Sequence, residues 1–506
     1  MTPHVLDRLG DWNPQLFREL KGRLKLRNVV ITVSISLLGQ FLLLLFFFSE
    51  MPLETDYSNW QRLLQEWWQN LFITSCCINI CILLVAGSYM LISDLSQEER
   101  RATLDFIRLS PRSEVNILTG KLLGVPILLY LAAVLTVPLQ LWAGLSAAIP
   151  LAKIFIFWVI VIVSCLFFYS AALLCSLVSG RLGGFLPWLG GGAVFLFLML
   201  MLSWVKNWTP VSDPSVWLRL FSPFESIFYL FSGSQRYSSR WFNLHWYYLP
   251  IGASALSFLG FTLFNYGLWV YWIGQSLKRC FRNPNNTILN KGQSYVLVAC
   301  LEVVILGFAL QELTNTNWYD IKINLILLLI LNSVVLLGLI ALLSPQRQAL
   351  QDWARYKKLQ TRHNTSVQDW VWGEKSPAVV AMAINLAIAI TPILLWIILQ
   401  SFEQLNKTKI FFDLAFFASW ILIYATMVQL MLMMKTPKRE VWAAGAVGSL
   451  ICLPPIILGV LGIFPNENPT MWLFSTLPWV GLEYGVTTTT VFIALIGEAI
   501  VLILLN

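Results

Sequence analysis

Ionisable and amide side chains inside long apolar stretches are the residues of this sequence most able to do chemistry. Glu302 and Glu498 each lie within a run of about 20 apolar residues, as do Asn332 and Asn385. A carboxyl group in hydrocarbon is energetically costly, so it usually pairs with a polar partner or lines a pathway. These four residues are therefore candidates for a proton or ion relay. The alternative is that they only form hydrogen bonds between the helices of a bundle.

Sequence motifs for enzymatic chemistry are absent. The chain has no G-x-x-x-x-G-K-[ST] phosphate-binding loop, no H-E-x-x-H zinc motif and no G-x-S-x-G nucleophile elbow. Its three histidines are scattered, and its eight cysteines form no C-x-x-C pair and mostly lie in apolar runs. We therefore expect no catalytic residue, no metal site and no cofactor within this chain, and we expect that it is not an enzyme.

A charged segment between two apolar runs, SQEERRATLDFIRLSPRSEVNILTGK at residues 96–121, is a second candidate site. Ser96 followed by Glu99 fits a capping box, and Pro111 disfavours helical geometry at the residue before it. The pattern predicts a short amphipathic helix within residues 94–112. Its apolar and flanking charged positions are Leu104, Phe106, Ile107, Arg100, Arg101 and Asp105. Such a helix would either dock against a partner protein or lie on the lipid surface.

The elements that must position these residues are membrane-spanning helices. The mean hydropathy is +0.70, and 57% of the residues are hydrophobic. Apolar runs of about 20 residues recur along the chain, whereas the alternating segments of about ten residues that build a barrel are missing. We predict an all-α, polytopic helical membrane protein with about twelve spans. The predicted spans are 29–48, 71–92, 115–147, 152–178, 184–205, 248–275, 294–313, 322–343, 377–400, 410–434, 441–464 and 488–505.

The distribution of basic residues predicts how the spans are oriented. Lys and Arg gather in every second connecting segment, as the positive-inside rule requires when the N-terminus is cytoplasmic. Topology thus explains the formal charge of +8, and we expect the lipid bilayer rather than nucleic acid as a partner. The predicted location is a plasma membrane of the bacterial inner-membrane type. Within the basic segment 1–28, Asn13 and Pro14 begin an amphipathic helix on the cytoplasmic membrane surface.

Weak internal echoes predict two related halves, residues 29–290 and 291–506. SPRSEV at residues 110–115 returns as TPKREV at residues 436–441, in each case before an apolar run. The first half also contains an aromatic segment at residues 206–247 that is broken by prolines. Its apolar piece is too short to cross a membrane, so the segment is predicted to be re-entrant or interfacial on the outer side.

The segment from Glu98 to Lys121 resembles the region after the second membrane helix of ABC-2-type exporter permeases. The positions that carry the resemblance are Glu98, Glu99, Arg100, Thr103, Leu104, Leu109, Ser110, Pro111, Gly120 and Lys121. In that family the segment holds a coupling helix that docks on a separate ATPase subunit. The docking residues that the resemblance implies here are Glu98, Glu99, Arg100, Arg101, Thr103, Leu104, Asp105, Phe106, Ile107, Leu109 and Pro111.

The resemblance implies a permease subunit that lacks an ATPase site of its own. Two copies of a partner ABC ATPase subunit, which would bind the ATP and Mg²⁺, would drive a lipid-like, glycan or hydrophobic substrate outward. The sequence leaves open whether the chain forms the pathway alone, as a homodimer or with a second permease. The basic stretch 346–363 is either an interfacial helix or a second ATPase contact. The alternative functions are an ion-driven secondary transporter that uses Glu302 or Glu498, and a polytopic membrane enzyme.

Overall fold

The computed structural model of the chain describes a helical membrane protein. It describes residues 10–52, 59–179, 184–206, 211–231, 241, 243–283, 286–311, 318–345, 347–359, 367–399, 406–436 and 438–505. Within these ranges every named element is a helix, and the only β pairing is an isolated bridge between Trp246 and Leu249. Twelve of the described helices are long and apolar enough to cross a membrane. The predicted all-α polytopic fold is confirmed.

The chain divides into two compact units. The first comprises Met1–Ser212 and Val216–Pro284, and the second comprises Asp213–Ser215 and Asn285–Asn506. Six of the twelve candidate spans lie in each unit. Each unit is therefore large enough to form a helix bundle with its own packed interior.

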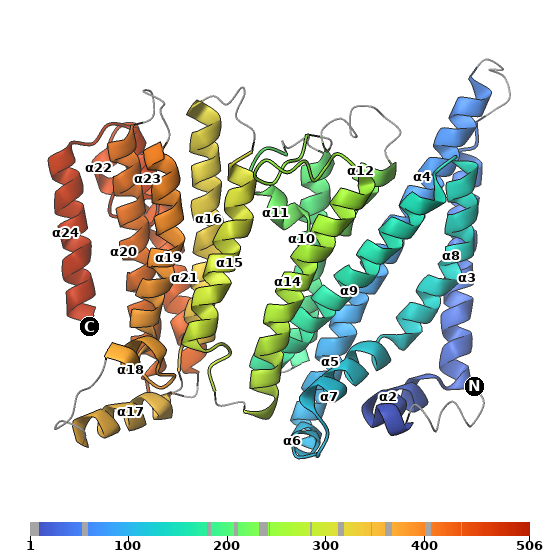
Figure 1. Cartoon of the computed structure of the whole chain (residues 1–506), viewed down its shortest axis with the longest axis horizontal. Helices are drawn as coiled ribbons and strands as arrows, with labels where there is room; N and C mark the ends of the chain where they lie inside the picture. The colour runs from blue at the N-terminus through green and yellow to red at the C-terminus, as the bar shows by residue number, and fades with distance from the viewer. Residues whose placement is uncertain are drawn as a thin grey trace. The chain divides into compact units, whose positions relative to one another are not determined.

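The first unit begins with a short helix that precedes its spans. This helix, α2 (Pro14–Arg23), is followed by the first span, α3 (Leu26–Ser49). The later helices are α4 (Trp60–Cys81), η1 (Ile82–Ala86), α5 (Gly87–Arg100), α6 (Thr103–Arg108), α7 (Glu114–Gly124), α8 (Ile127–Ser146), α9 (Leu151–Ser179), α10 (Leu186–Lys206), α11 (Val216–Arg219), α12 (Pro223–Phe231) and α14 (Ala255–Arg282). Within this unit, α2, α6 and α7 lie at one end and α11 and α12 at the other (Figure 1).

The start of α2 follows directly from its sequence. The side chain of Asn13 accepts a hydrogen bond from the backbone N–H of Leu16 (3.0 Å), and Pro14 occupies the first helical position. Both features were predicted and are confirmed. However, α2 buries Gln15 and Glu19 as well as its leucines. A helix that only rested on lipid would not bury polar residues, and α2 indeed packs against α7.

A π-helical turn, η1, interrupts the second span between α4 and α5. The turn packs against Tyr169 of α9, whose hydroxyl donates a hydrogen bond to the carbonyl oxygen of Leu83 (2.8 Å). Gly87 follows the turn, and a Cβ at that position would lie 2.2 Å from the Tyr169 hydroxyl. The π turn frees a carbonyl oxygen for this tyrosine, and the glycine leaves room for its ring.

The predicted re-entrant segment 206–247 contains the short helices α11 and α12. Arg219 and Glu225 form an ion pair between them (2.6 Å), with side chains only 3% and 1% exposed. The Arg219 guanidinium also lies over the ring of Trp241, which is itself buried. Because α12 packs against α9 and α4, this part of the segment belongs to the interior of the first unit. Residues 207–210, 232–240 and 242 of the predicted segment lie outside the described residues.

The second unit places two short helices at each end of its bundle. Its helices are α15 (Lys291–Ala309), α16 (Trp318–Leu343), α17 (Arg347–Leu359), α18 (Val367–Trp372), α19 (Ala378–Leu399), α20 (Lys407–Leu432), α21 (Arg439–Val460), α22 (Pro469–Trp472), α23 (Pro478–Glu483) and α24 (Thr488–Leu505). Within this unit, α17 and α18 lie at the end opposite to α22 and α23 (Figure 1).

The two units share three pairings of their spans. In the first unit α3 packs on α8, α5 on α9 and α9 on α14, which are the first span on the third, the second on the fourth and the fourth on the sixth. The corresponding pairs in the second unit are α15 with α19, α16 with α20 and α20 with α24. A short helix between the fifth and sixth spans also contacts the fourth in each unit, α12 on α9 and α23 on α20. The units differ in other pairings, since the fifth span packs mainly on the second in the first unit (α10 on α5) and on the fourth in the second unit (α21 on α20).

The two similar hexapeptides of the predicted sequence echo lie at different places in their units. Residues 110–115 lie between the second and third spans of the first unit, whereas residues 436–441 lie between the fourth and fifth spans of the second. The two hexapeptides therefore connect different pairs of spans in their units. The element of the second unit between its second and third spans is instead the pair α17 and α18.

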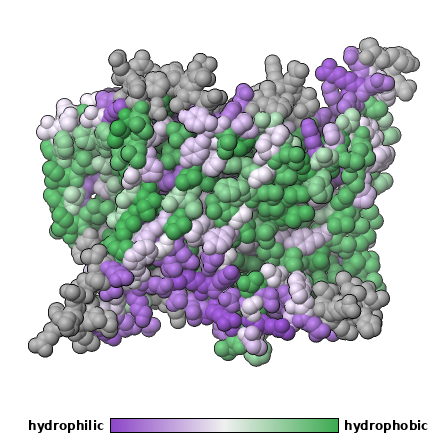
Figure 2. Space-filling model, in the orientation of Figure 1, coloured by the Kyte–Doolittle hydropathy of each residue, from purple (hydrophilic) through white to green (hydrophobic). Residues whose placement is uncertain are grey.

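The surface of the spans is apolar. Hydrophobic side chains cover the sides of the helices, and hydrophilic side chains gather at their ends (Figure 2). Large exposed residues on the spans include Phe41, Leu196, Val334 and Ile496. Patches of this size would aggregate in water, but they suit the hydrocarbon of a bilayer.

Candidate functional site

The predicted helix within residues 94–112 is two separate elements. Residues 94–100 are the end of α5, and Ser96 lies in the middle of that helix, where its hydroxyl meets that of Ser176 on α9 (3.3 Å). The predicted capping box at Ser96 is therefore wrong. The helix continues through Ser96 because its buried face also continues, to Leu95, which is fully buried. Tertiary packing thus outweighs the local capping signal.

A sharp turn separates α5 from the short helix α6 (Thr103–Arg108). Ala102 adopts the left-handed conformation (φ 55°), which costs a residue with a Cβ about 1 kcal/mol or more. The hydroxyl of Thr103 donates to the carbonyl oxygen of Glu98 across this turn (3.1 Å). After α6 the chain passes Pro111, and Ser113 caps α7 by accepting a hydrogen bond from Asn116 N–H (3.3 Å). The result is a compact loop that links the second span to the third.

The apolar residues of α6 divide into an inner and an outer pair. Leu104 and Ile107 are 1% and 8% exposed, so they pack inside the first unit. Phe106 and Leu109 are 80% and 85% exposed. Figure 2 shows the resulting apolar patch at the position of α6, beside a hydrophilic surface. We call Phe106 and Leu109 the apolar tip. The predicted docking anchors Leu104 and Ile107 are unavailable to a partner, and of the three predicted apolar anchors only Phe106 is exposed.

The other predicted docking residues, apart from Glu98, are exposed. Glu98 points away from the apolar tip into an ion cluster described below. The exposed members of this set are Glu99, Arg100, Arg101, Thr103, Asp105 and Pro111. Asp105 forms an ion pair with Arg108 within α6 (2.9 Å). A polar rim around an apolar centre is the usual arrangement of a protein-binding surface.

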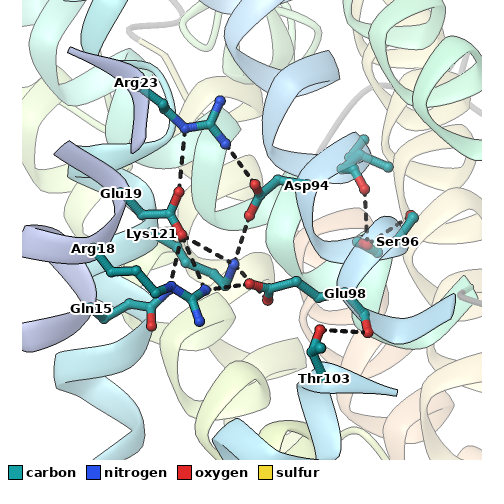
Figure 3. Close-up of polar contacts among 11 residues, drawn as sticks. Gln15, Arg18, Glu19, Arg23, Asp94, Ser96, Glu98, Thr103 and Lys121 are labelled. Carbon is teal, nitrogen blue, oxygen red and sulfur yellow. Dashed lines mark hydrogen bonds and ion pairs between the residues drawn. The ribbon is translucent and has the colours of Figure 1, made fainter. Parts of the chain in front are cut away.

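A cluster of six ionised side chains lies at the base of this loop (Figure 3). We call it the ion cluster, and it consists of Arg18, Glu19, Arg23, Asp94, Glu98 and Lys121. Arg23 contacts Asp94 (2.6 Å) and Glu19 (3.3 Å), while Arg18 pairs with Glu98. Three positive and three negative groups therefore offset one another. Partial burial lowers the pKa of Arg18, but the carboxylates of Glu98 and Glu19 outweigh this and raise it above its ordinary value.

Lys121 is the centre of the ion cluster. Its side chain is fully buried, and its ammonium nitrogen lies 2.6 Å from Asp94 Oδ2, 2.7 Å from Glu98 Oε2 and 3.8 Å from Glu19 Oε1. Because these carboxylates come from α5 and α2, one lysine on α7 connects three helices. The connection fixes the helix that enters the loop to the helix that leaves it.

Two glycines of α7 allow α2 to approach closely enough to form the cluster. A Cβ on Gly120 would lie 2.8 Å from Asn13 Oδ1 and 2.9 Å from the backbone nitrogen of Leu16. A Cβ on Gly124 would lie 2.5 Å from the Cβ of Glu19. The amide of Asn13 also donates to the carbonyl oxygen of Asn116 on α7 (2.7 Å). Gly120 and Lys121 thus act together, one providing space for α2 and the other binding its carboxylate.

Sequence reasoning singled out two of the six members of the ion cluster, Glu98 and Lys121. It missed the other four, which are Arg18, Glu19, Arg23 and Asp94. A signal was present in Asp94, an acidic residue close to the end of an apolar run, and in Glu19 between two basic residues. These signals do not specify which residues meet, because the partners are separated by 71 and 80 positions in the chain.

The acidic part of the ion cluster has the spacing of a metal site. Among the described residues, one group of this kind was found, and the ligand atoms of Glu19, Asp94 and Glu98 all lie within 4.8 Å of one another. The ammonium of Lys121 lies among them and supplies the positive charge that a metal ion would supply. The three carboxylates of the cluster are balanced by its three basic side chains, so there is no reason to assign a metal ion here.

The four predicted intramembrane residues all lie in the second unit and are buried. Asn385 of α19 donates to Ser294 of α15 (2.9 Å), and Asn332 donates to the carbonyl oxygen of Leu328 in its own helix (3.2 Å). These two residues form ordinary bundle hydrogen bonds, in keeping with the alternative of a structural role.

The two carboxyl groups belong to different helix interfaces. Glu302 of α15 is 2% exposed and has the amide of Asn332 on α16 as a neighbour, but neither of its oxygens makes a hydrogen bond of ordinary geometry. Glu498 of α24 accepts a hydrogen bond from Ser419 of α20. The structure therefore does not combine Glu302 and Glu498 into one relay, and Glu302 is the less satisfied of the two.

Comparisons with protein-family models, with curated proteins and with solved structures give no match to this chain. The class of this protein is therefore assigned from its fold alone. The chain is a multi-span helical membrane protein, and its two six-span units are compatible with a transporter.

Proposed function

We propose that the chain is the transmembrane permease subunit of an ATP-driven exporter of the ABC-2 type. The observation that supports this most strongly is the apolar tip, Phe106 and Leu109, exposed on a loop whose base is fixed by a buried ion cluster. A partner ATPase would cover the tip, and its movement would be transmitted to the second and third spans. In this proposal the end that carries α2 and α6 is cytoplasmic, as the distribution of basic residues predicts.

Rigidity is what makes this loop suitable for transmitting force. A flexible loop would absorb the movement of a partner, whereas a contact with two discrete positions passes it on. Lys121 holds α5, α2 and α7 together, and the buried Leu104 and Ile107 hold α6 to the unit. The tip therefore moves only when the spans beneath it move. The cargo would be lipid-like, glycan or hydrophobic, and the plasma membrane would be its location.

The test of the docking surface is co-purification of ATPase activity. The tagged chain, purified from its own host membranes, should carry a vanadate-sensitive ATPase with it. Phe106→Asp combined with Leu109→Asp should remove most of this activity, because burying two charges against an apolar groove costs several kcal/mol. The conservative pair Phe106→Leu and Leu109→Met should retain it. If the Asp variant keeps both the ATPase and export, this docking surface is wrong.

A second candidate is favoured by Glu302, a buried carboxyl group with no hydrogen bond to either oxygen. Such a group suits an ion-gradient-driven secondary transporter, since it is available to bind a proton or cation. Proteoliposomes that contain only this chain separate the two functions. Transport driven by an ion gradient without ATP, and lost in Glu302→Gln or Glu498→Gln, would establish the second candidate. Export that requires the ATPase and survives both substitutions would reject it.

A further inference from the structure

A pocket lies between α16, α20 and α23 of the second unit. Its volume is about 300 Å³, which falls at the lower end of the range of ligand sites in proteins. It begins where α16 and α20 begin, at the end of the bundle that carries α23 (Figure 1). Neither the apolar tip nor the ion cluster contributes to it, so the inference below does not depend on the proposed function.

The pocket is long and apolar along most of its length. On α16 it extends from Lys322 to Ser333, which are eleven positions and about 16 Å apart along the helix axis. On α20 it extends from Lys409 to Phe417, about 12 Å. One leaflet of a bilayer has a hydrocarbon depth of about 15 Å. The pocket therefore has the length of one leaflet, and Leu329 lines its wall.

The mouth of the pocket is polar and contains charges of both signs. Lys322 and Glu483 form an ion pair there, and Lys409 and Asp413 also line it. Lys409 forms no ion pair with the described residues, and one carboxylate oxygen of Asp413 is buried without a hydrogen bond. Among the described residues, the mouth thus offers two ammonium groups and two carboxylates, and one ion pair, between Lys322 and Glu483, joins them.

An amphiphile with a zwitterionic headgroup matches this arrangement. A phosphate fits beside the lysines, an ammonium group fits beside Asp413 and Glu483, and a hydrocarbon chain fits the apolar wall below. A purely anionic headgroup would leave the carboxylates unmatched, and a quaternary ammonium could not donate hydrogen bonds to them. The pocket wall includes Ile330, which is 46% exposed on the side of the bundle, so a chain can enter from the membrane.

We propose that this pocket binds one acyl chain of a bilayer phospholipid whose headgroup carries both a phosphate and a primary amine. Lys322 and Lys409 receive the phosphate, and Asp413 and Glu483 receive the amine. The acyl chain lies against Leu329 and reaches the level of Ser333 and Phe417.

The test is native mass spectrometry of the purified full chain. Phosphatidylethanolamine, phosphatidylglycerol and phosphatidylcholine with identical acyl chains are added in turn. We expect one bound phosphatidylethanolamine, with an affinity about tenfold above that of the other two lipids. Equal retention of all three lipids would show ordinary annular lipid and would overturn the proposal.

Matched variants locate the binding. Lys409→Ala should abolish the headgroup preference, whereas Lys407→Ala should keep it, because Lys407 lies on the same turn but does not line the pocket. Leu329→Trp should reduce binding of phosphatidylethanolamine about tenfold by filling the pocket. Val334→Trp should not reduce binding, since Val334 is exposed outside the pocket.

The melting temperature of each variant shows whether it is folded. If Leu329→Trp does not fold, Ser333→Phe takes its place as the pocket-filling variant. Unchanged preference and affinity in Lys409→Ala and the pocket-filling variant would reject the site.

Discussion

Lys121 illustrates how a buried charge is made tolerable in this protein. Removing an ammonium group from water costs several kcal/mol, and that cost is offset only by close partners with good geometry. Here two carboxylates lie within 2.7 Å of the nitrogen and a third lies at 3.8 Å. The two arginines of α2 then neutralise the excess negative charge of the carboxylates. No member of the ion cluster can be removed without leaving an unbalanced neighbour.

Lys121→Met therefore provides a direct test at the scale of one residue. The substitution keeps the length of the side chain but leaves Asp94, Glu98 and Glu19 without their central cation. We expect a loss of about 3–5 kcal/mol of stability, seen as a fall in Tm of several degrees for the purified protein. Lys153→Met, at the start of α9, should change Tm little, because Lys153 forms no ion pair with the described residues. Equal effects of the two substitutions would contradict the role given to the cluster.

The sequence indicates which segment is a candidate site more readily than it indicates the role of each residue within that segment. The segment 96–121 was singled out as a candidate site, and Lys121 belonged to its pattern. The anchors were mistaken because Leu104, Phe106 and Ile107 are all apolar, and apolar character alone does not distinguish a residue that holds a loop in place from one that meets a partner. Leu104 and Ile107 lie three positions apart on one face of α6, and that face packs inward.

At the scale of elements, the contact between α2 and α7 depends on glycine. Gly120 and Gly124 are four positions apart and present a smooth face on which α2 lies. Without this face, Glu19 could not reach Lys121. The amphipathic helix α2, which was predicted to lie on the membrane surface, is thus packed against α7 on one face.

Gly120→Ala should loosen α2. The new methyl group would lie 2.9 Å from the backbone nitrogen of Leu16, so the helix must shift. Hydrogen–deuterium exchange in residues 14–23 should therefore rise. Gly22→Ala, within α2 itself, has nothing within 4 Å of its new Cβ and should slow exchange through its higher helix propensity, worth up to about 1 kcal/mol. A rise in exchange in both variants would count against close packing at Gly120.

The spans could be predicted because a bilayer dictates their length and apolar composition. Their ends were less predictable, since neighbouring elements decide them. The predicted span 115–147 is divided into α7 and α8, with Pro126 at the start of α8. The predicted span 71–92 extends to Arg100, because contacts with α9 stabilise the helix beyond the apolar run. Short-range sequence patterns carry no information about such contacts.

At the scale of the whole molecule, the division of the chain into two six-span units bears on stoichiometry. Both units place a connecting element between their second and third spans, the loop with α6 in the first unit and the pair α17 and α18 in the second. The proposed function calls for two permease units, and one copy of this chain has two six-span units. Under the proposed function, a second copy is unnecessary.

We accordingly expect one copy of this chain to bind two ATPase subunits. The mass of the purified complex, measured by light scattering or native mass spectrometry, checks this directly. The double variant Phe106→Asp and Leu109→Asp offers a sharper test, since it disables the docking element of the first unit only. The complex should then retain one ATPase subunit, bound through α17 and α18, with little of the vanadate-sensitive activity, because the proposed mechanism needs two ATPase subunits. Two copies of this chain in the wild-type complex would contradict the expectation.

The π turn η1 has a consequence for how this chain tolerates changes in length. Such a turn contains one residue more than the α-helical turn it replaces, so deletion of a residue within 82–86 would leave a regular helix. The residues after it would keep nearly their present orientation about the helix axis, because the wider π turn already absorbs the additional residue. Asp94 and Glu98 would still face Lys121, whereas deletion of one residue from the regular helix between Gly87 and Asp94 would rotate both by about 100° and separate them from it. The π turn is therefore a place in the second span where the chain can lose a residue without separating the loop from its base.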